Sequence, residues 1–379
     1  MSNKVKRKIT TSISKAKKFI SKTKKNVSVD PQIENVRGRV RKFLGIGDTK
    51  RIAIISDNDQ DGITSSVQLK KYFSSKKIVS EVFFYDHYSK KLSIPVEEFI
   101  RFSPEKTVFL DLSDGIVSDA LLQVGKHTGP FLVVDHHQSE SIKNDAFHYI
   151  VIKPWSFSTI EPSKYPTTKM VADLFAPIDW ICSIGIVGDF AFEQWKDYLD
   201  KVKKKYRLNQ KDLLNMDELV GCVSSQYSER INTLFNFLCS AKYPRELLKS
   251  EFFALKILFD KNLVALKERF DKEAECYSEG VCFFHADPRF SSKLSNIISV
   301  ERKNMVVIIF ELPGPMMKCS IRRQDFKINC GDLAKQCTIG LVNAKGGGHI
   351  PAAGATFIPQ DLEKFKTNVR EYLLRNPAK

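Results

Sequence analysis

Short apolar runs without alternation recur in the first half of the chain and predict buried strands. The runs are RIAIIS at 51–56, TVFL at 107–110, FLVV at 131–134 and SIGIV at 183–187. Such runs are typical of parallel strands that are buried on both faces of a sheet. Between them, residues 65–73 and 116–124 show helical spacing. This alternation predicts an α/β fold with a doubly wound parallel sheet.

The second half begins with helical spacing and returns to strands. Residues 196–205, 215–240 and 251–276 are predicted helices, and the last has an apolar face made of Phe252, Leu255, Leu258, Phe259 and Leu263. This face packs either against the first domain or within a spacer between domains. Strands are predicted at 281–284 and 305–310, and a closing helix at 362–374.

These patterns divide the chain into four parts. We expect a basic flexible tail (1–45), a first domain with a parallel sheet (46–195), a helical linker (196–277) and a smaller α/β domain (278–379).

Acidic residues follow the four predicted strands of the first half. The first run leads into DNDQDG at 57–62, the second into Asp111, the third into Asp135-His136-His137, and the fourth into Asp189. A single Asp after a strand is often a helix N-cap. Four such positions, one beside two histidines, instead indicate a site, because the carboxyl ends of parallel strands meet at one edge of the sheet.

The residue types at this edge indicate metal chemistry. Carboxylates with an imidazole suit Mn²⁺, Mg²⁺ or Fe²⁺ better than Zn²⁺. Asp59 and Asp61 could serve two neighbouring ions, with Asp111 bridging them and His136 and Asp189 completing one shell. Two ions about 3.5–4 Å apart stabilise both oxygens of an in-line displacement at phosphorus. Gly62 allows a tight turn behind the carboxylates.

The motifs DNDQDG, DLSDG, DHH and GD, in this order, resemble the DHH phosphoesterase superfamily, and KGGGHIPAAG resembles its DHHA1 partner domain. The resemblance runs from about residue 50 to the C-terminus. Pyrophosphatase and oligoribonuclease-type members carry a histidine where this chain has Ile55, and here Asp57 precedes Asp59 by two residues. That form looks like the RecJ-type exonucleases, including the GINS-associated nucleases of archaea.

The resemblance implies roles for individual residues. His137 would contact the reacting phosphate, and Asp135 would orient the histidine pair. Asp57 would replace the absent histidine as a ligand. The metal ligands carried over are Asp57, Asp59, Asp61, Asp111, His136 and Asp189, and the ions implied are two Mn²⁺, with Mg²⁺ as the substitute.

A glycine-rich motif near the C-terminus is predicted to bind substrate. Successive glycines at 346–348 could present backbone N–H groups to a phosphate, although such runs are often only flexible loops. The preceding arginines could pair with phosphates, or could be solvated charges at a strand end. The predicted substrate-binding residues are Arg322, Arg323, Gly346, Gly347, Gly348 and His349.

Composition favours a polyanionic partner. The chain has 379 residues and a net charge of +16, and the first 25 residues hold ten Lys or Arg and no acidic residue. Such a segment can contact phosphates non-specifically. The eight cysteines include no CxxC pair and are expected to be reduced, mostly buried thiols of a cytoplasmic protein. No apolar run reaches about 18 residues, so no membrane span is expected.

Three functions follow from these features. The first is an Mn²⁺-dependent exonuclease that degrades single-stranded DNA or RNA to mononucleotides. The second is a phosphodiesterase for short oligonucleotides or cyclic dinucleotides. The third is a replication-complex scaffold without activity. The DxDxDG form and the basic charge favour the first, in which replication or helicase proteins are further expected partners.

Overall fold

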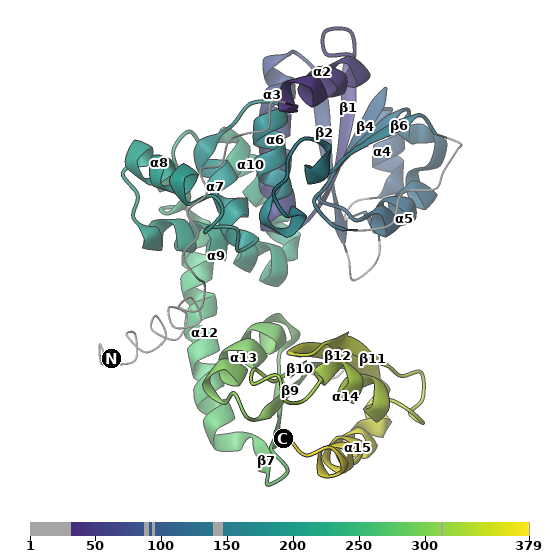
Figure 1. Cartoon of the computed structure of the whole chain (residues 1–379), viewed down its shortest axis with the longest axis vertical. Coiled ribbons are helices and arrows are strands. Elements are labelled where there is room, and N and C mark those ends of the chain that lie inside the picture. The colour runs from purple at the N-terminus through teal and green to yellow at the C-terminus, as the bar shows by residue number, and fades with distance from the viewer. Residues whose placement is uncertain (1–31, 87–90, 93–94, 139–146, 312–313, 379) are drawn as a thin grey trace. The chain divides into compact units, whose positions relative to one another are not determined.

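The computed structural model describes residues 32–86, 91–92, 95–138, 147–311 and 314–378 (Figure 1). The chain forms two compact units that divide between Ile257 and Leu258. We call the described residues up to Ile257 the N-terminal unit and those from Leu258 the C-terminal unit. Each has its own α/β sheet, as the sequence predicts.

The sheet of the N-terminal unit is parallel apart from one edge strand. Its strands lie in the order β3-β2-β1-β4-β5-β6, and only β3 is antiparallel to its neighbour. The strands are β1 (Arg51–Asp57), β2 (Val79–Asp86), β3 (Lys91–Leu92), β4 (Lys106–Leu110), β5 (Phe131–Val134) and β6 (Tyr149–Ile152).

Helices cover both faces of this sheet, which explains the unbroken apolar runs. In β1, Ile52 and Ile54 belong to one buried cluster, and Ala53 and Ile55 belong to another on the opposite face. The first cluster includes residues of α2 (Ile33–Leu44), α3 (Gln60–Ser75) and α6 (Thr167–Leu174). The second includes residues of α4 (Val96–Phe102) and α5 (Asp114–Val124) (Figure 1).

Two sequence predictions about elements need correction. The expected tail boundary at residue 45 is too late, because α2 buries Ile33, Val36, Val40 and Leu44 in the core. The run SIGIV is not a strand but lies in α7 (Asp179–Gly188), whose residues 180–187 are all buried. A helix that is apolar all round cannot be told from a buried strand by periodicity. Residues 1–31 of the predicted tail lie outside the described residues.

The helices after residue 195 extend the core of the N-terminal unit. Leu199, Met216, Leu234 and Phe252 belong to the same buried cluster as the sheet. The predicted linker is therefore continuous with the first core as far as Ile257. The helices are α8 (Lys196–Tyr206), α9 (Gln210–Gln226), α10 (Ile231–Ser240), α11 (Pro244–Leu247) and α12 (Glu251–Glu273).

The C-terminal unit is built on a mixed sheet in the order β11-β12-β10-β9-β8-β7. Only β8 and β9 are parallel neighbours. One cluster on this sheet is closed by α14 and α15. The elements are β7 (Glu275–Tyr277), β8 (Val281–Ala286), β9 (Val306–Glu311), β10 (Met317–Arg322), β11 (Lys345–His349), β12 (Ala352–Phe357), α13 (Pro288–Glu301), α14 (Cys330–Cys337) and α15 (Leu362–Arg375).

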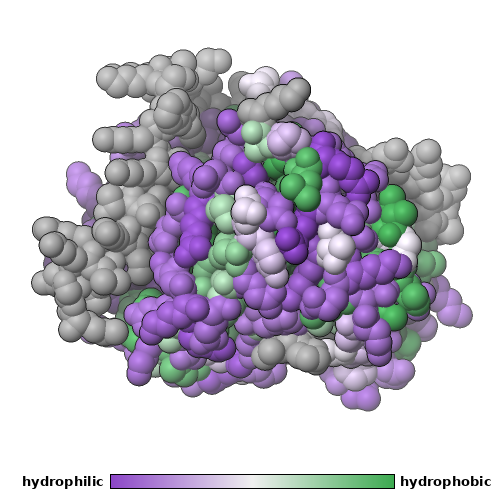
Figure 2. Space-filling model, turned by 90° about the horizontal axis from the view of Figure 1, so that it is seen from below, coloured by the Kyte–Doolittle hydropathy of each residue, from purple (hydrophilic) through white to green (hydrophobic). Residues whose placement is uncertain are grey.

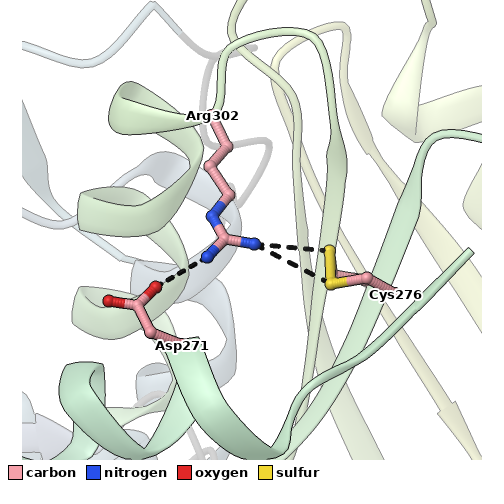
Figure 3. The surroundings of a disulfide bond; sticks show 4 residues. Asp271, Cys276 and Arg302 are labelled. Atoms are coloured by element: carbon pink, nitrogen blue, oxygen red, sulfur yellow. Dashed lines mark hydrogen bonds and ion pairs between the residues drawn. A yellow bond between two sulfur atoms is a disulfide. The ribbon is translucent and has the colours of Figure 1, made fainter.

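Two of the eight cysteines form a disulfide, which corrects the prediction that all are reduced. Cys276 and Cys282 face each other directly across β7 and β8, with Cα atoms 4.1 Å apart. The Arg302 guanidinium lies 3.8 and 3.9 Å from the two sulfurs and 2.6 Å from an oxygen of Asp271 (Figure 3). Hairpin register, which residue spacing does not reveal, brings this pair together. The pattern of cysteines in the sequence therefore does not indicate a reducing compartment.

The face of the molecule seen in Figure 2 is mainly hydrophilic. Figure 2 shows one face on which hydrophobic residues are scattered among polar ones. Isolated exposed hydrophobic residues are normal on a folded protein. Among the described helices, none is both long and apolar enough to cross a membrane.

Candidate metal centre

The predicted ligands converge at the carboxyl edge of the N-terminal sheet in overlapping groups. Three sets have potential ligand atoms within 4.8 Å of one another. Asp111 and His136 each belong to two of them, so the groups are contiguous. The sets are Asp57, Asp59 and Asp111; Asp61, His136 and Asp189; and Asp111, His136 and His137.

The DNDQDG segment places its three carboxylates by turning from β1 into α3. Asp57 ends β1, and Asp59 caps α3 by accepting a hydrogen bond from the Gly62 N–H at 2.9 Å. The N-cap role and membership of the site therefore coexist in Asp59. A Cβ on Gly62 would lie 2.3 Å from the Asp57 carbonyl oxygen, so only glycine permits this turn.

Asp61 is fully buried and is oriented by the first turn of α6. Its two oxygens accept hydrogen bonds from the N–H groups of Thr167 and Thr168, both at 2.7 Å. A helix N-terminus favours a carboxylate because its N–H groups are otherwise unpaired. A Cβ on Gly185 would lie 2.9 Å from an Asp61 oxygen, so this glycine of α7 makes room for the ligand.

Asp111 occupies a left-handed backbone conformation directly after β4. Its φ is 59°, a region that aspartate tolerates better than most residues. Its N–H donates to the Val134 carbonyl at 3.0 Å, and its carboxylate accepts from the Thr167 hydroxyl at 3.0 Å. This central ligand is thus fixed by the neighbouring strand and by α6.

His136 connects Asp111 to Asp189. Its Nε2 lies 3.5 Å from an Asp111 oxygen and 3.3 Å from an Asp189 oxygen. Its Nδ1 lies 3.3 Å from the carbonyl of Pro162. Asp189 caps the C-terminus of α7, where the helix dipole disfavours a negative charge. A bound cation would compensate for this placement.

His137 belongs to a hydrogen-bonded chain that reaches into the core. Its Nδ1 lies 2.7 Å from one oxygen of the buried Asp135, whose other oxygen accepts from Lys153 at 2.5 Å. Lys153 also donates to the His137 carbonyl at 3.0 Å and lies 3.4 Å from Asp114. The imidazole is therefore oriented from behind, and half of its side chain remains exposed.

The electrostatics of the centre favour a divalent cation. Burial and the charge of Asp57 raise the pKa of Asp59 to about 7. Burial, reinforced by neighbouring carboxylates, raises the pKa values of Asp61 and Asp111 well above the usual range. Burial also lowers the pKa of His136, which keeps its imidazole neutral as a ligand must be. A cluster of closely spaced carboxylates with an imidazole offers the oxygen and nitrogen ligands that suit Mn²⁺ or Mg²⁺.

The predicted glycine loop is instead an edge strand of the C-terminal sheet. Gly346, Gly347 and Gly348 lie in β11, which pairs with β12. A Cβ on Gly346 would lie 2.2 Å from the Ala334 carbonyl oxygen, and one on Gly331 would lie 2.4 Å from that of Gly348. The glycines therefore permit close packing of α14 on β11, and His349 ends the strand with its side chain exposed.

The two predicted substrate arginines lie in different surroundings. Arg323 is buried and forms two hydrogen bonds with Asp325, at 2.7 and 2.8 Å, so an internal carboxylate occupies its guanidinium. Arg322, at the end of β10, is partly buried, and its Nη2 lies 3.4 Å from the Ser292 hydroxyl. Burial lowers the pKa of Arg322. Arg322 is therefore the better placed of the two to contact a phosphate.

Comparison with known proteins agrees with this architecture. Residues 284–374 match the family model of the DHHA1 domain. RecJ from Thermus thermophilus, crystallised with Mn²⁺, superposes with a TM-score of 0.68 at 15% identity over 93% of this chain. The chain has the RecJ-like DHH/DHHA1 fold. It spans 56% of the Thermus protein's length.

Two further solved structures match this chain over nearly the full length of both proteins. An exonuclease RecJ bound to manganese has a TM-score of 0.65 at 15% identity, covering 94% of this chain and 97% of its own. The DHH domain of a member of a family of ribosomal proteins has a TM-score of 0.66 at 14% identity, covering 98% of both chains. A search of the curated proteins found no match to the sequence. The candidate metal centre lies in the N-terminal unit, outside the residues that match the DHHA1 model.

Sequence reasoning missed several residues around the candidate metal centre. Lys153 follows β6, so the same strand-end signal that indicated the acidic residues could have found it. Thr168 acts through its backbone N–H, Thr167 through its N–H and its hydroxyl, and Gly185 through the absence of a side chain. No chemical signal in the sequence distinguishes such positions.

Proposed function

We propose that the protein is a metal-dependent single-strand exonuclease that hydrolyses DNA or RNA to nucleoside monophosphates. The observation that carries the proposal is the overlap of the ligand groups, which share Asp111 and His136 and so provide for two neighbouring cations. The DHHA1 match and the fold shared with structures named RecJ support a nucleic-acid substrate. The net charge of +16 supports a polyanionic substrate.

Two divalent ions, Mn²⁺ or Mg²⁺, would be held by Asp57, Asp59, Asp61, Asp111, His136 and Asp189. When bound, they would supply Lewis acidity and an activated water for in-line attack at phosphorus. The protein keeps their ligands in position through the amides of α6 and the turn at Gly62.

His137 is the group that we assign to the reacting phosphate. Its hydrogen bond with Asp135 raises the pKa of its imidazole, which favours the protonated form. A protonated imidazole can donate a hydrogen bond or a proton to an oxygen of the phosphate. Burial opposes ionisation of Asp135, but its hydrogen bond with His137 and the charge of Lys153 lower its pKa and keep it an acceptor.

We assign the DHHA1 domain to holding the strand. Arg322 would pair with a phosphate, and β11 would present backbone N–H groups from its free edge. Arg323, Gly346, Gly347, Gly348 and His349 remain predicted members of this surface. Contact with replication or helicase proteins and a cytoplasmic location remain predictions that the described residues do not address.

One assay tests the proposal. End-labelled single-stranded DNA and RNA of two to thirty nucleotides would be incubated with Mn²⁺ or Mg²⁺, and the products resolved by length. We expect stepwise release of mononucleotides from strands of all but the shortest lengths. Cleavage confined to two- to five-mers would favour the short-oligonucleotide phosphodiesterase, and no cleavage with either metal would favour the scaffold.

A further inference from the structure

A phenylalanine with an exposed ring follows the metal ligand Asp189 directly. Phe190 is 74% exposed, although every residue from Trp180 to Val187 in the preceding helix is buried. Isolated exposed hydrophobic residues are common, so exposure alone assigns nothing. Phe190 and Phe326 are both exposed phenylalanines with left-handed backbone angles, and Phe190 is the one of the two that adjoins a predicted metal ligand.

Phe190 stands where a helix C-terminus normally has glycine. Its N–H donates to the Val187 carbonyl at 3.1 Å, and the Ala191 N–H donates to the Ile186 carbonyl at 3.0 Å. These two bonds define a Schellman motif, whose residue after the cap adopts left-handed backbone angles. Phe190 has a φ of 54°. A bulky residue in this region is a true outlier and costs stability that glycine would not.

The Phe190 ring packs against a neighbouring ring. The Phe192 ring meets it edge to face, with centroids 6.2 Å apart, and Phe192 in turn packs against the core of the N-terminal unit. The aromatic ring is therefore exposed, held by a second ring and attached to the residue that follows a predicted metal ligand. The predicted ligands of the centre are carboxylates and imidazoles, which suit cations and phosphate and offer the base of a nucleotide no apolar partner.

We propose that Phe190 stacks on the base of the nucleotide whose phosphate lies at the metal centre. The inference rests on the proposed nuclease function and adds a base subsite to it. Stacking of this kind tolerates every base, because each has a π face. It would hold the terminal nucleotide without selecting sequence, which suits an exonuclease that removes every nucleotide in turn.

The test separates stacking from a structural role. Binding of a fluorescent single-stranded pentanucleotide would be measured with Ca²⁺ in place of Mn²⁺, for wild type, Phe190→Gly and Phe190→Tyr. We expect Phe190→Gly to weaken binding about tenfold, and Phe190→Tyr to retain it. Because glycine suits the left-handed position, Phe190→Gly should keep or raise the melting temperature, which excludes misfolding as the cause.

A second strand series identifies the group that is contacted. Each position of the pentanucleotide would be replaced in turn by an abasic residue. At one terminal position, wild type should lose about tenfold in affinity, and Phe190→Gly should lose nothing further. Leu122→Ala, at an 84% exposed residue of α5, is the control for removing a surface apolar group and should bind as wild type does.

Each outcome is decisive. The stacking role is overturned if wild type and Phe190→Gly bind the intact strand with equal affinity. It is also overturned if both proteins lose the same affinity on every abasic strand. A wild type that binds strands but never cleaves them with Mn²⁺ refutes the nuclease proposal and leaves the stacking comparison valid. A wild type that binds no strand overturns both.

Discussion

Asp61 is held by backbone groups rather than by a basic side chain. Its two oxygens accept from the first amides of α6, and its pKa is raised by burial and by the charges of Asp189 and Asp59. Helix amides orient a carboxylate without neutralising it. The buried carboxylates therefore favour their protonated forms without metal and become ionised when a cation binds, so the site is costly to the metal-free protein at neutral pH.

This cost has a predictable pH dependence. Asp59 has a folded-state pKa of about 7 against 3.8 for an ordinary aspartate, so the folded protein binds its proton more tightly than the unfolded chain does. The free energy of unfolding of the metal-free protein should therefore fall as pH rises from about 4 to about 7. Mn²⁺ requires the ionised form, so its stabilising effect should grow over the same range.

Thermal unfolding in EDTA and in Mn²⁺ across this pH range checks the prediction. Asp59→Asn removes one of the titrating groups and should reduce the slope of the metal-free curve, to which Asp61 and Asp111 also contribute. Metal-free stability that rises between pH 4 and 7 would contradict the assignment of raised carboxylate pKa values.

Lys153 is the one cation buried directly behind the centre, among the described contacts of Asp135. Lys153→Met should leave the buried Asp135 carboxylate with His137 as its basic partner but without the lysine, and lower the free energy of unfolding by about 3–5 kcal/mol. Lys205→Met is the matched control, because the Lys205 side chain is 59% exposed beside Asp179 and should contribute less than about 1 kcal/mol. Urea denaturation measures both, and equal effects would show that Lys153 is not needed for the buried charge.

Among the secondary-structure elements, the ends of the parallel strands could be predicted from the sequence. The helices and neighbouring strands that pack against those ends could not. β1, β4 and β5 lie where unbroken apolar runs place them, and each is followed by the expected acidic residue. α7 was mistaken for a strand because its burial on all sides removes the helical period. Hairpin register likewise hid the pairing of Cys276 with Cys282.

β11 shows why a glycine run need not be a loop. Gly346 is tight because a Cβ there would meet the Ala334 carbonyl at 2.2 Å, whereas the nearest atom to one on Gly347 is the Lys335 Cε at 3.8 Å. Gly346→Ala should therefore destabilise the C-terminal unit by about 1–3 kcal/mol through overpacking against α14. Gly347→Ala should change stability by less than about 0.5 kcal/mol.

Guanidinium denaturation, monitored by a spectroscopic signal that reports on unfolding of the C-terminal unit, distinguishes Gly346→Ala from Gly347→Ala. Equal stability of both would mean that β11 is not packed closely on α14. Loss of strand binding in Gly347→Ala at unchanged stability would instead support the predicted substrate role of this strand.

At the scale of the whole molecule, two α/β units in the expected order carry the metal centre and the DHHA1 domain. Their order could be predicted because each has its own motifs. Their boundary could not, since the helical pattern of α12 continues through Ile257 and Leu258 without a break. A helix that belongs to two cores has no sequence signal at the point of division.

The central claim is that Asp111 joins the ligand groups into one catalytic metal centre. The direct measurement compares wild type, Asp111→Ala and the exposed-residue control Asp48→Asn, with Mn²⁺ binding by calorimetry and cleavage of an end-labelled single strand. We predict two Mn²⁺ ions per chain for wild type and for Asp48→Asn, fewer for Asp111→Ala, and loss of cleavage in Asp111→Ala with strand binding retained. Wild-type cleavage by Asp111→Ala would contradict the account.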